Sequence, residues 1–106
     1  MIAPEQRKYP RVRPPRSIVA AWQVGTQRGV SFLESLSVGG LFIRTREVLP
    51  VRSLMQILLD LPVGQVRCRG IVRSASHPRG VAVQIIAMDP TDRARLFAQM
   101  TKLLLA

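Results

Sequence analysis

The sequence predicts an all-β domain with a terminal helix, namely a small six-stranded antiparallel β-barrel followed by one C-terminal α-helix. From residue 17 onward, apolar residues recur at about every second position, which is typical of half-buried strands. Short turn sequences rich in glycine and proline separate these runs. Near the end of the chain the apolar spacing changes to a helical one. A barrel is favoured over an open sheet because closure leaves no strand edge exposed.

Length and composition predict one domain in the cytoplasm. The chain has 106 residues and 47% hydrophobic residues, enough for one core but too short for two. Cys68 is the single cysteine and His77 the single histidine, so neither an intramolecular disulfide nor a zinc site is expected. No apolar stretch resembles a secretion signal or reaches the length of a bilayer span, so membrane insertion is not expected either.

The charge of the chain points to an anionic partner. Its formal net charge is +10, from 16 basic and 6 acidic residues, and the basic residues are nearly all arginine. Residues 1–16 combine four prolines with five basic side chains, a composition that disfavours both helix and sheet. We therefore expect a flexible basic N-terminal arm over residues 1–16 and a folded domain over residues 17–106. A solvated basic tail without a binding role would have the same composition.

The first two predicted strands cover residues 17–24 and 29–37. In the first, Ile18 and Trp22 belong to the apolar face, and residues 25–29 form the turn that follows. In the second, strict alternation places Phe32 on an apolar face and points Ser35 and Ser37 the same way.

Four further strands are predicted over residues 41–46, 53–61, 65–73 and 80–87. The run 65–73 alternates most regularly, with Cys68 among the core positions and Arg67, Arg69 and Arg73 facing solvent. A helix should follow, with Asp89 as N-cap, Pro90 in the first helical position and Asp92 favourable to the helix dipole. Its apolar stripe should pack across an open end or side of the barrel, and comprises Leu96, Phe97, Met100, Leu103 and Leu104.

Two short motifs suggest a binding site. Arg7 and Arg11 lie four residues apart, and their planar guanidinium groups can bind phosphates or the O6/N7 edge of guanine bidentately. The polar turn over residues 35–40 supplies hydroxyl groups, and its glycines allow a ligand to approach the backbone closely.

In this order, and followed by a series of short strands, the two motifs resemble the PilZ domain family. The signature of that family is R-x-x-x-R followed by [D/N]-x-S-x-x-G. The later segments 68–73 and 80–85 are also similar to family strands, so the resemblance covers nearly the whole chain. It implies a small barrel whose usual ligand is cyclic di-GMP.

The resemblance also implies which residues bind this ligand. Arg7 and Arg11 correspond to the arginine pair, Ser37 to the family's serine and Gly40 to its closing glycine, while Lys8 and Arg73 are further candidates. Ser35 occupies the position of Asp or Asn. Because a hydroxyl reaches less far than a carboxylate, we expect binding to be weaker by roughly 1 kcal/mol.

The function predicted from the sequence is a non-enzymatic cyclic di-GMP receptor or adaptor that transmits the level of the messenger to an unidentified effector protein. No nucleophile has a partner and no carboxylate pair is evident, no cofactor or metal is expected, and the apolar helix allows pairing with a second copy. One alternative is a degenerate PilZ module that binds a protein but no nucleotide, through the helix or through Arg67, Arg69 and Arg73. Another is a basic barrel that binds DNA or RNA, which is disfavoured because stacking aromatics are few.

Overall fold

The computed structural model describes residues 10–105 and shows a closed barrel of six antiparallel strands with one C-terminal helix, which confirms the predicted fold. The order of strands around the barrel is β1-β2-β3-β6-β5-β4. The elements are β1 (Val19–Val24), β2 (Gln27–Leu36), β3 (Gly40–Arg44), β4 (Leu54–Leu61), β5 (Gly64–Ser76), β6 (Gly80–Met88) and α1 (Pro90–Leu105).

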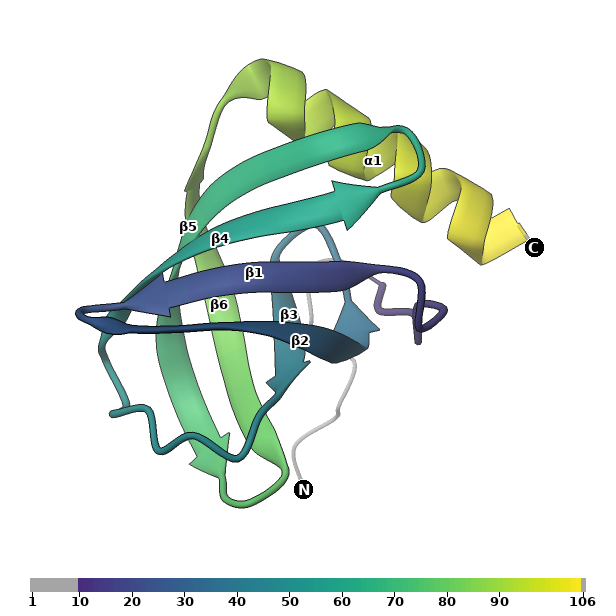
Figure 1. The fold of residues 1–106 in the computed structure, drawn as a ribbon. Helices are drawn as coiled ribbons and strands as arrows, with labels where there is room; N and C mark the ends of the chain where they lie inside the picture. Colours follow the sequence, from purple (N-terminus) through teal and green to yellow (C-terminus); the bar gives the residue numbers. More distant parts are fainter. Residues whose placement is uncertain (1–9, 106) are drawn as a thin grey trace, which may run out of the picture.

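Each half of the chain contributes three consecutive antiparallel strands to the barrel (Figure 1). Strands β1, β2 and β3 pair in sequence, as do β4, β5 and β6. Pairing of β1 with β4 and of β3 with β6 joins the two halves and closes the barrel. Because every strand has two neighbours, no sheet edge is left open to other chains.

The core consists of the inward-facing residues of this alternation. Ile18, Ala20, Trp22 and Val24 are all buried, as their spacing predicts. Leu36, Leu41, Ile43 and Leu59 are fully buried, and each such side chain contributes about 1.5–3 kcal/mol relative to exposure.

Strand β2 departs from strict alternation, and the predicted position of Phe32 is wrong. The pairing with β3 shifts between Leu33 and Ser35, which marks a β-bulge. Because a bulge adds one residue to a strand, Leu33 and Leu36 both face the core although three positions separate them. Phe32 instead faces outward and is 44% exposed. The guanidinium of Arg16 lies over its ring, 5.2 Å from the ring centroid.

Helix α1 crosses behind the turn between β4 and β5 (Figure 1) and packs mainly on β5. Leu96 and Met100 enter the core as predicted, but Phe97 is 56% exposed and Leu104 is also exposed. A helix turns by about 100° per residue, so Phe97 points away from the face that Leu96 presents to the barrel. Within the described residues 10–105, no helix has the length and apolar character needed to cross a bilayer.

Candidate functional site

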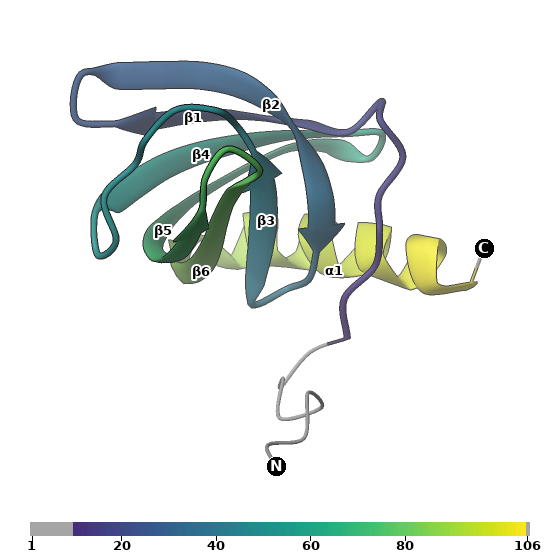
Figure 2. The ribbon, with the colours of Figure 1, turned by 90° about the horizontal axis from the view of Figure 1, so that it is seen from below.

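The N-terminal segment lies beside the polar turn that follows β2. The backbone N–H of Val12 donates to the carbonyl of Leu36 at 3.0 Å, and the N–H of Leu36 donates to the carbonyl of Val12 at 2.9 Å. These two bonds form an antiparallel bridge, and Figure 2 shows the segment running alongside the end of β2. The bridge fixes Arg11 and Arg13, the neighbours of Val12, beside the turn.

Ser37 makes the hydrogen bonds that hold this turn together. It is buried, and its hydroxyl oxygen accepts hydrogen bonds from the backbone N–H groups of Gly39 at 3.2 Å and Gly40 at 3.0 Å. The Ser37 hydroxyl also lies 3.1 Å from the carbonyl of Gly40, and the Ser37 N–H donates to that carbonyl at 2.8 Å. Local bonds of this kind are the usual reason for serine in turns. In this structure the hydroxyl of Ser37 therefore determines the shape of the turn.

Gly40 allows two close approaches. A Cβ atom at this position would lie 2.7 Å from the carbonyl oxygen of Val83, which is too close for two strands to pair normally. It would also lie 3.7 Å from Nη2 of Arg11, so the guanidinium of Arg11 stands directly over the glycine. The carbonyl of Gly39 accepts a hydrogen bond from the N–H of Ile85 at 2.9 Å, which attaches the turn to β6.

Arg73 reaches the same surface from β5. Its Nε donates to the side-chain oxygen of Gln84, and Gln84 is the cross-strand partner of Gly40. Arg73, Gln84, Gly40 and Arg11 thus form a continuous row over β5, β6 and β3. The structure brings together two predicted arginines that lie far apart in the sequence, with a glycine between them.

A second set of residues adjoins this row. Ser35 pairs with Phe42 across β2 and β3, and the guanidinium of Arg79 lies 4.8 Å from the centroid of the Phe42 ring. Arg79 also forms a two-pronged ion pair with Glu34, in which Nε donates to Oε2 at 2.9 Å and Nη2 donates to Oε1. This hydrogen bonding lowers the pKa of Glu34 below its ordinary value, although partial burial opposes the shift, and nearby Arg44 and Arg13 lower it further.

Sequence reasoning missed Glu34, Phe42 and Arg79. Arg79 belongs to the turn between β5 and β6 and lies 45 positions from Glu34, so no local spacing relates the two. The only available signal was an acidic residue immediately before Ser35.

The structure includes five of the predicted binding residues, namely Arg11, Ser35, Ser37, Gly40 and Arg73. Arg7 and Lys8 lie outside the described residues. Among the five, Arg11, Gly40 and Arg73 belong to one surface row, Ser35 is half-buried beside Phe42, and Ser37 is buried in the turn.

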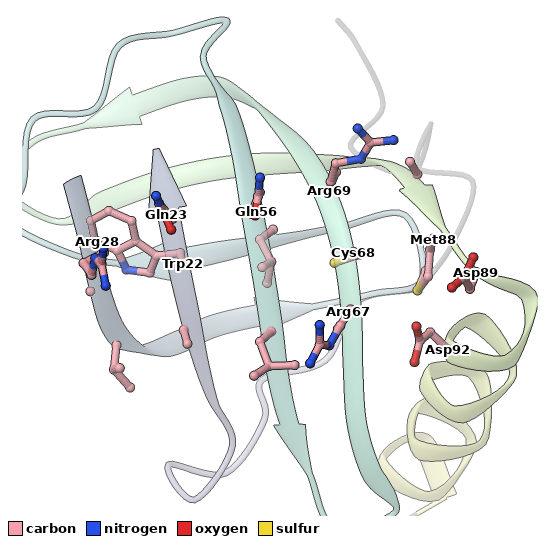
Figure 3. Close-up of a pocket in the computed structure, with 16 residues that line it drawn as sticks. Trp22, Gln23, Arg28, Gln56, Arg67, Cys68, Arg69, Met88, Asp89 and Asp92 are labelled. Atoms are coloured by element: carbon pink, nitrogen blue, oxygen red, sulfur yellow. The ribbon is translucent and has the colours of Figure 1, made fainter. Parts of the chain in front are cut away.

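A groove of about 890 Å³ lies elsewhere on the barrel (Figure 3), and its lining includes none of Arg11, Ser35, Ser37, Gly40 and Arg73. It crosses β2, β1, β4 and β5 along two outward rows of cross-strand partners. One row is polar and the other mainly apolar: Arg28, Gln23, Gln56 and Arg69 form the first, and Val30, Ala21, Leu58 and Arg67 form the second. Asp89 and Asp92 lie at the end of the groove where α1 begins (Figure 3).

Cys68 also lines this groove but has no nucleophilic character. Its side chain is buried, and burial, assisted by the charge of Asp92, raises the pKa of the thiol to about 12. The thiol is therefore protonated at neutral pH, whereas thiol reactivity requires the thiolate. Within residues 10–105, no three side chains of the His, Cys, Asp or Glu type lie close enough together to hold a metal ion.

Comparison with known proteins identifies relatives of this barrel. The model of the family described as "PilZ domain" matches residues 5–102. No curated protein sequence matches the chain.

Three solved structures share the fold. MrkH of K. pneumonia, solved as a complex with c-di-GMP, is 16% identical with a TM-score of 0.81, over 95% of this chain and 53% of that one. The PilZ domain of YcgR from Escherichia coli, also solved with c-di-GMP, is 16% identical with a TM-score of 0.74, over 95% and 93% of the two chains. The Bacillus subtilis inhibitor of motility MotI is 18% identical with a TM-score of 0.75, over 95% and 52%. The chain spans about half the length of the MrkH and MotI structures.

Proposed function

Because the chain belongs to the PilZ domain family, we propose that it is a receptor for cyclic di-GMP that passes the level of this second messenger on to a partner protein. One observation carries the proposal: the bridge between Val12 and Leu36 places the guanidinium of Arg11 over Gly40. The solved structures of MrkH and of the YcgR PilZ domain, which contain c-di-GMP, support the choice of ligand.

In this proposal the ligand binds over the row from Arg11 to Arg73. Arg11, together with Arg7, binds the phosphates and the guanine edges, and each good bidentate contact contributes roughly 1–3 kcal/mol. Gly40 allows β3 and β6 to pair closely beneath the guanidinium of Arg11, because a Cβ there would meet the carbonyl oxygen of Val83. Arg73 provides a second guanidinium plane on which a purine can stack. The hydroxyl of Ser35 adds a hydrogen bond, and Ser37 maintains the turn.

The signalling step depends on the N-terminal arm. We propose that the part of the arm before Val12, which carries Arg7, closes over the bound nucleotide and so changes the surface that the domain presents, while the bridge already holds Arg11 beside the turn. A ligand can shift this equilibrium only if it binds the closed arrangement more tightly than the open one. Arg7 supplies this difference, since it contacts the ligand only when the arm is closed.

Calorimetric titration with cyclic di-GMP at moderate salt tests the proposed site. Arg11→Ala should weaken binding by about 5- to 150-fold, which corresponds to the loss of one bidentate contact. Arg28→Ala is the matched control, because Arg28 carries the same charge near the opposite end of β2. Equal affinities of Arg11→Ala and the wild type would disprove the site, and equal losses in both variants would indicate a nonspecific effect of charge.

The groove favours a second candidate activity, the binding of a partner protein. Its rows offer three exposed arginines, Arg28, Arg67 and Arg69, around the apolar side chains of Val30 and Leu58. Val30 is 71% exposed, which is unusual for a valine in a strand. This combination complements an extended acidic segment with alternating apolar side chains. We therefore assign the groove to such a segment of the effector, lying over β1, β2, β4 and β5 and away from Asp89 and Asp92.

A probe peptide of alternating Glu and Leu tests this surface by amide chemical shift titration. Shifts should concentrate on the groove, a Glu–Ser peptide of equal charge should bind more weakly, and Arg67→Glu should reduce binding more than Arg46→Glu, a control in the loop after β3. Equal binding of both peptides would show that charge alone is recognised and would contradict the assignment. If this surface binds while cyclic di-GMP does not, the chain is a protein-binding PilZ module without a nucleotide.

A further inference from the structure

Recognition of both donors of guanine requires a second acceptor besides the hydroxyl of Ser35. The Watson–Crick edge of guanine presents two adjacent donors, N1–H and the 2-amino group. A carboxylate accepts only, and its two oxygens can bind both donors at once. A serine hydroxyl has a single oxygen and reaches less far, so it cannot bind both in this way. If the chain binds cyclic di-GMP as proposed above, the hydroxyl of Ser35 can accept from one of these donors, and the second acceptor must come from another residue.

Glu34 is the only carboxylate within residues 10–105 that lies beside the proposed site. Glu47 lies in the loop after β3, Asp60 on β4, and Asp89 and Asp92 at the start of α1. Glu34 immediately precedes Ser35, and the ion pair with Arg79 holds its carboxylate near Phe42, the cross-strand partner of Ser35.

The ion pair with Arg79 leaves this carboxylate able to accept further bonds. Arg79 approaches both oxygens in a fork, with Nε bonded to Oε2 and Nη2 bonded to Oε1. Each carboxylate oxygen offers two acceptor sites. The fork of Arg79 occupies the two sites that face the same way, and the remaining two point to opposite sides of the carboxylate, so one of them can accept a single donor of a ligand. The side chain of Glu34 retains 22% of its exposure, so the carboxylate is not sealed from solvent. The stacking of Arg79 on Phe42 fixes the direction from which the fork approaches.

We propose that Glu34 binds the Watson–Crick edge of one guanine of cyclic di-GMP and thereby determines base specificity, with Arg79 as the positioning residue. This inference rests on the proposed function and deepens it. Glu34 supplies, from the adjacent position, the second acceptor that Ser35 cannot provide, and it accepts from the 2-amino group.

The opposing hypothesis, that Glu34 serves only to anchor Arg79, predicts a change of the opposite sign. Cyclic di-GMP carries two negative phosphates, so a carboxylate that made no bond to the base would repel it. Glu34→Gln would then strengthen binding, because it removes a negative charge and releases Arg79. Our proposal instead predicts weaker binding, since the neutral amide oxygen is a weaker acceptor for the 2-amino group than the carboxylate is.

Titration of two ligands into each variant separates these hypotheses. Cyclic di-IMP keeps N1–H but lacks the 2-amino group, so it measures recognition of that group alone. The wild type should prefer cyclic di-GMP by about 10-fold, as expected for one hydrogen bond to a charged partner. In Glu34→Gln the affinity for cyclic di-GMP should fall and this preference should shrink to about 2-fold. Arg79→Ala should also reduce the preference, because the carboxylate then loses its fixed orientation.

Glu47→Gln is the matched control, since it removes the same group from an exposed loop and should leave both affinities unchanged. Thermal melts of every variant verify folding. An unchanged preference in Glu34→Gln, or tighter binding of cyclic di-GMP, overturns the role of Glu34 while the receptor function stands. Failure of the wild type to bind cyclic di-GMP overturns both.

Discussion

Val12 and Leu36 exchange both of their backbone hydrogen bonds, at 3.0 and 2.9 Å. Leu36 is the last residue of β2, and the turn with Ser37 and Gly40 follows directly. The bridge therefore couples the position of Arg11 to the shape of the turn. A change that breaks the bridge should move the guanidinium away from Gly40 even though Arg11 and Gly40 are themselves unchanged.

Val12→Pro should separate the arm from the barrel. Proline has no N–H and cannot donate to Leu36, so the bridge loses one of its two bonds. We expect cyclic di-GMP affinity to fall by about 10-fold, comparable to the loss of the Arg11 contact, while the melting temperature changes little. Val12→Ala keeps the backbone donor and should bind like the wild type. Calorimetry on both variants makes the comparison, and wild-type affinity of Val12→Pro would show that the bridge is dispensable.

Gly40→Ala should destabilise the barrel itself. The added Cβ would meet the carbonyl oxygen of Val83 at 2.7 Å, so β3 and β6 must separate locally. We expect a loss of about 2 kcal/mol in the free energy of unfolding, as for other overpacked sites. Gly25→Ala meets no neighbouring atom but has a positive φ of 59°, and should cost only about 1 kcal/mol. Urea unfolding of both variants gives the comparison, which fails if Gly40→Ala is the milder change.

Gln99→Leu should stabilise the protein. Gln99 is buried between α1 and the barrel, and its Oε1 makes no hydrogen bond within residues 10–105. A buried polar atom without a partner costs about 1–3 kcal/mol, and an apolar side chain of similar size removes that cost. We expect a gain of about 1 kcal/mol in urea unfolding. Gln56→Leu, at an exposed position on β4, should be nearly neutral. A less stable Gln99→Leu would mean that the amide is satisfied.

The ion pair of Glu34 and Arg79 should stabilise the fold only above acidic pH. Hydrogen bonding to Arg79 lowers the pKa of Glu34 in the folded state below 4.5, the value expected in the unfolded chain. A carboxyl group with a lowered pKa contributes stability above its unfolded pKa and loses it as the pH falls through its folded pKa. The wild type should therefore melt slightly higher than Glu34→Gln at pH 6 to 7, and the difference should vanish toward pH 3. A difference that grows on acidification would contradict the lowered pKa.

Alternation and the turn sequences predicted the strands and much of the core, and the barrel followed from the argument that closure leaves no strand edge exposed. The buried set Ile18, Ala20, Trp22 and Val24 follows from period two, because strand residues face opposite sides in turn. The bulge in β2 was not predictable in this way, since no particular residue type marks the position where the extra residue is inserted. Strict alternation therefore assigned Phe32 to the wrong face. The predicted burial of Phe97 was wrong for a similar reason, because an apolar residue at the border of a helical stripe can face either the core or solvent.

The candidate site likewise contains residues that the sequence predicted and residues that it could not predict. Arg11, Ser37 and Gly40 were found through the family motif, and the periodicity of the sequence alone would not have related them. Glu34 and Arg79 were missed because their pairing is a tertiary contact across 45 positions. A one-dimensional pattern contains no information on which turn meets which strand, so such pairs become visible only once the strand order is known.

The pairing of β3 with β6 is one of the two seams where the first half of the chain meets the second. The row from Arg11 to Arg73 runs across this seam, with Gly40 on one side and Gln84 on the other. A molecule bound by both arginines therefore stabilises the pairing of β3 with β6. Bound ligand should slow the separation of the two halves of the barrel. The resistance of the protein to proteolysis should therefore increase with the fraction of protein that has ligand bound.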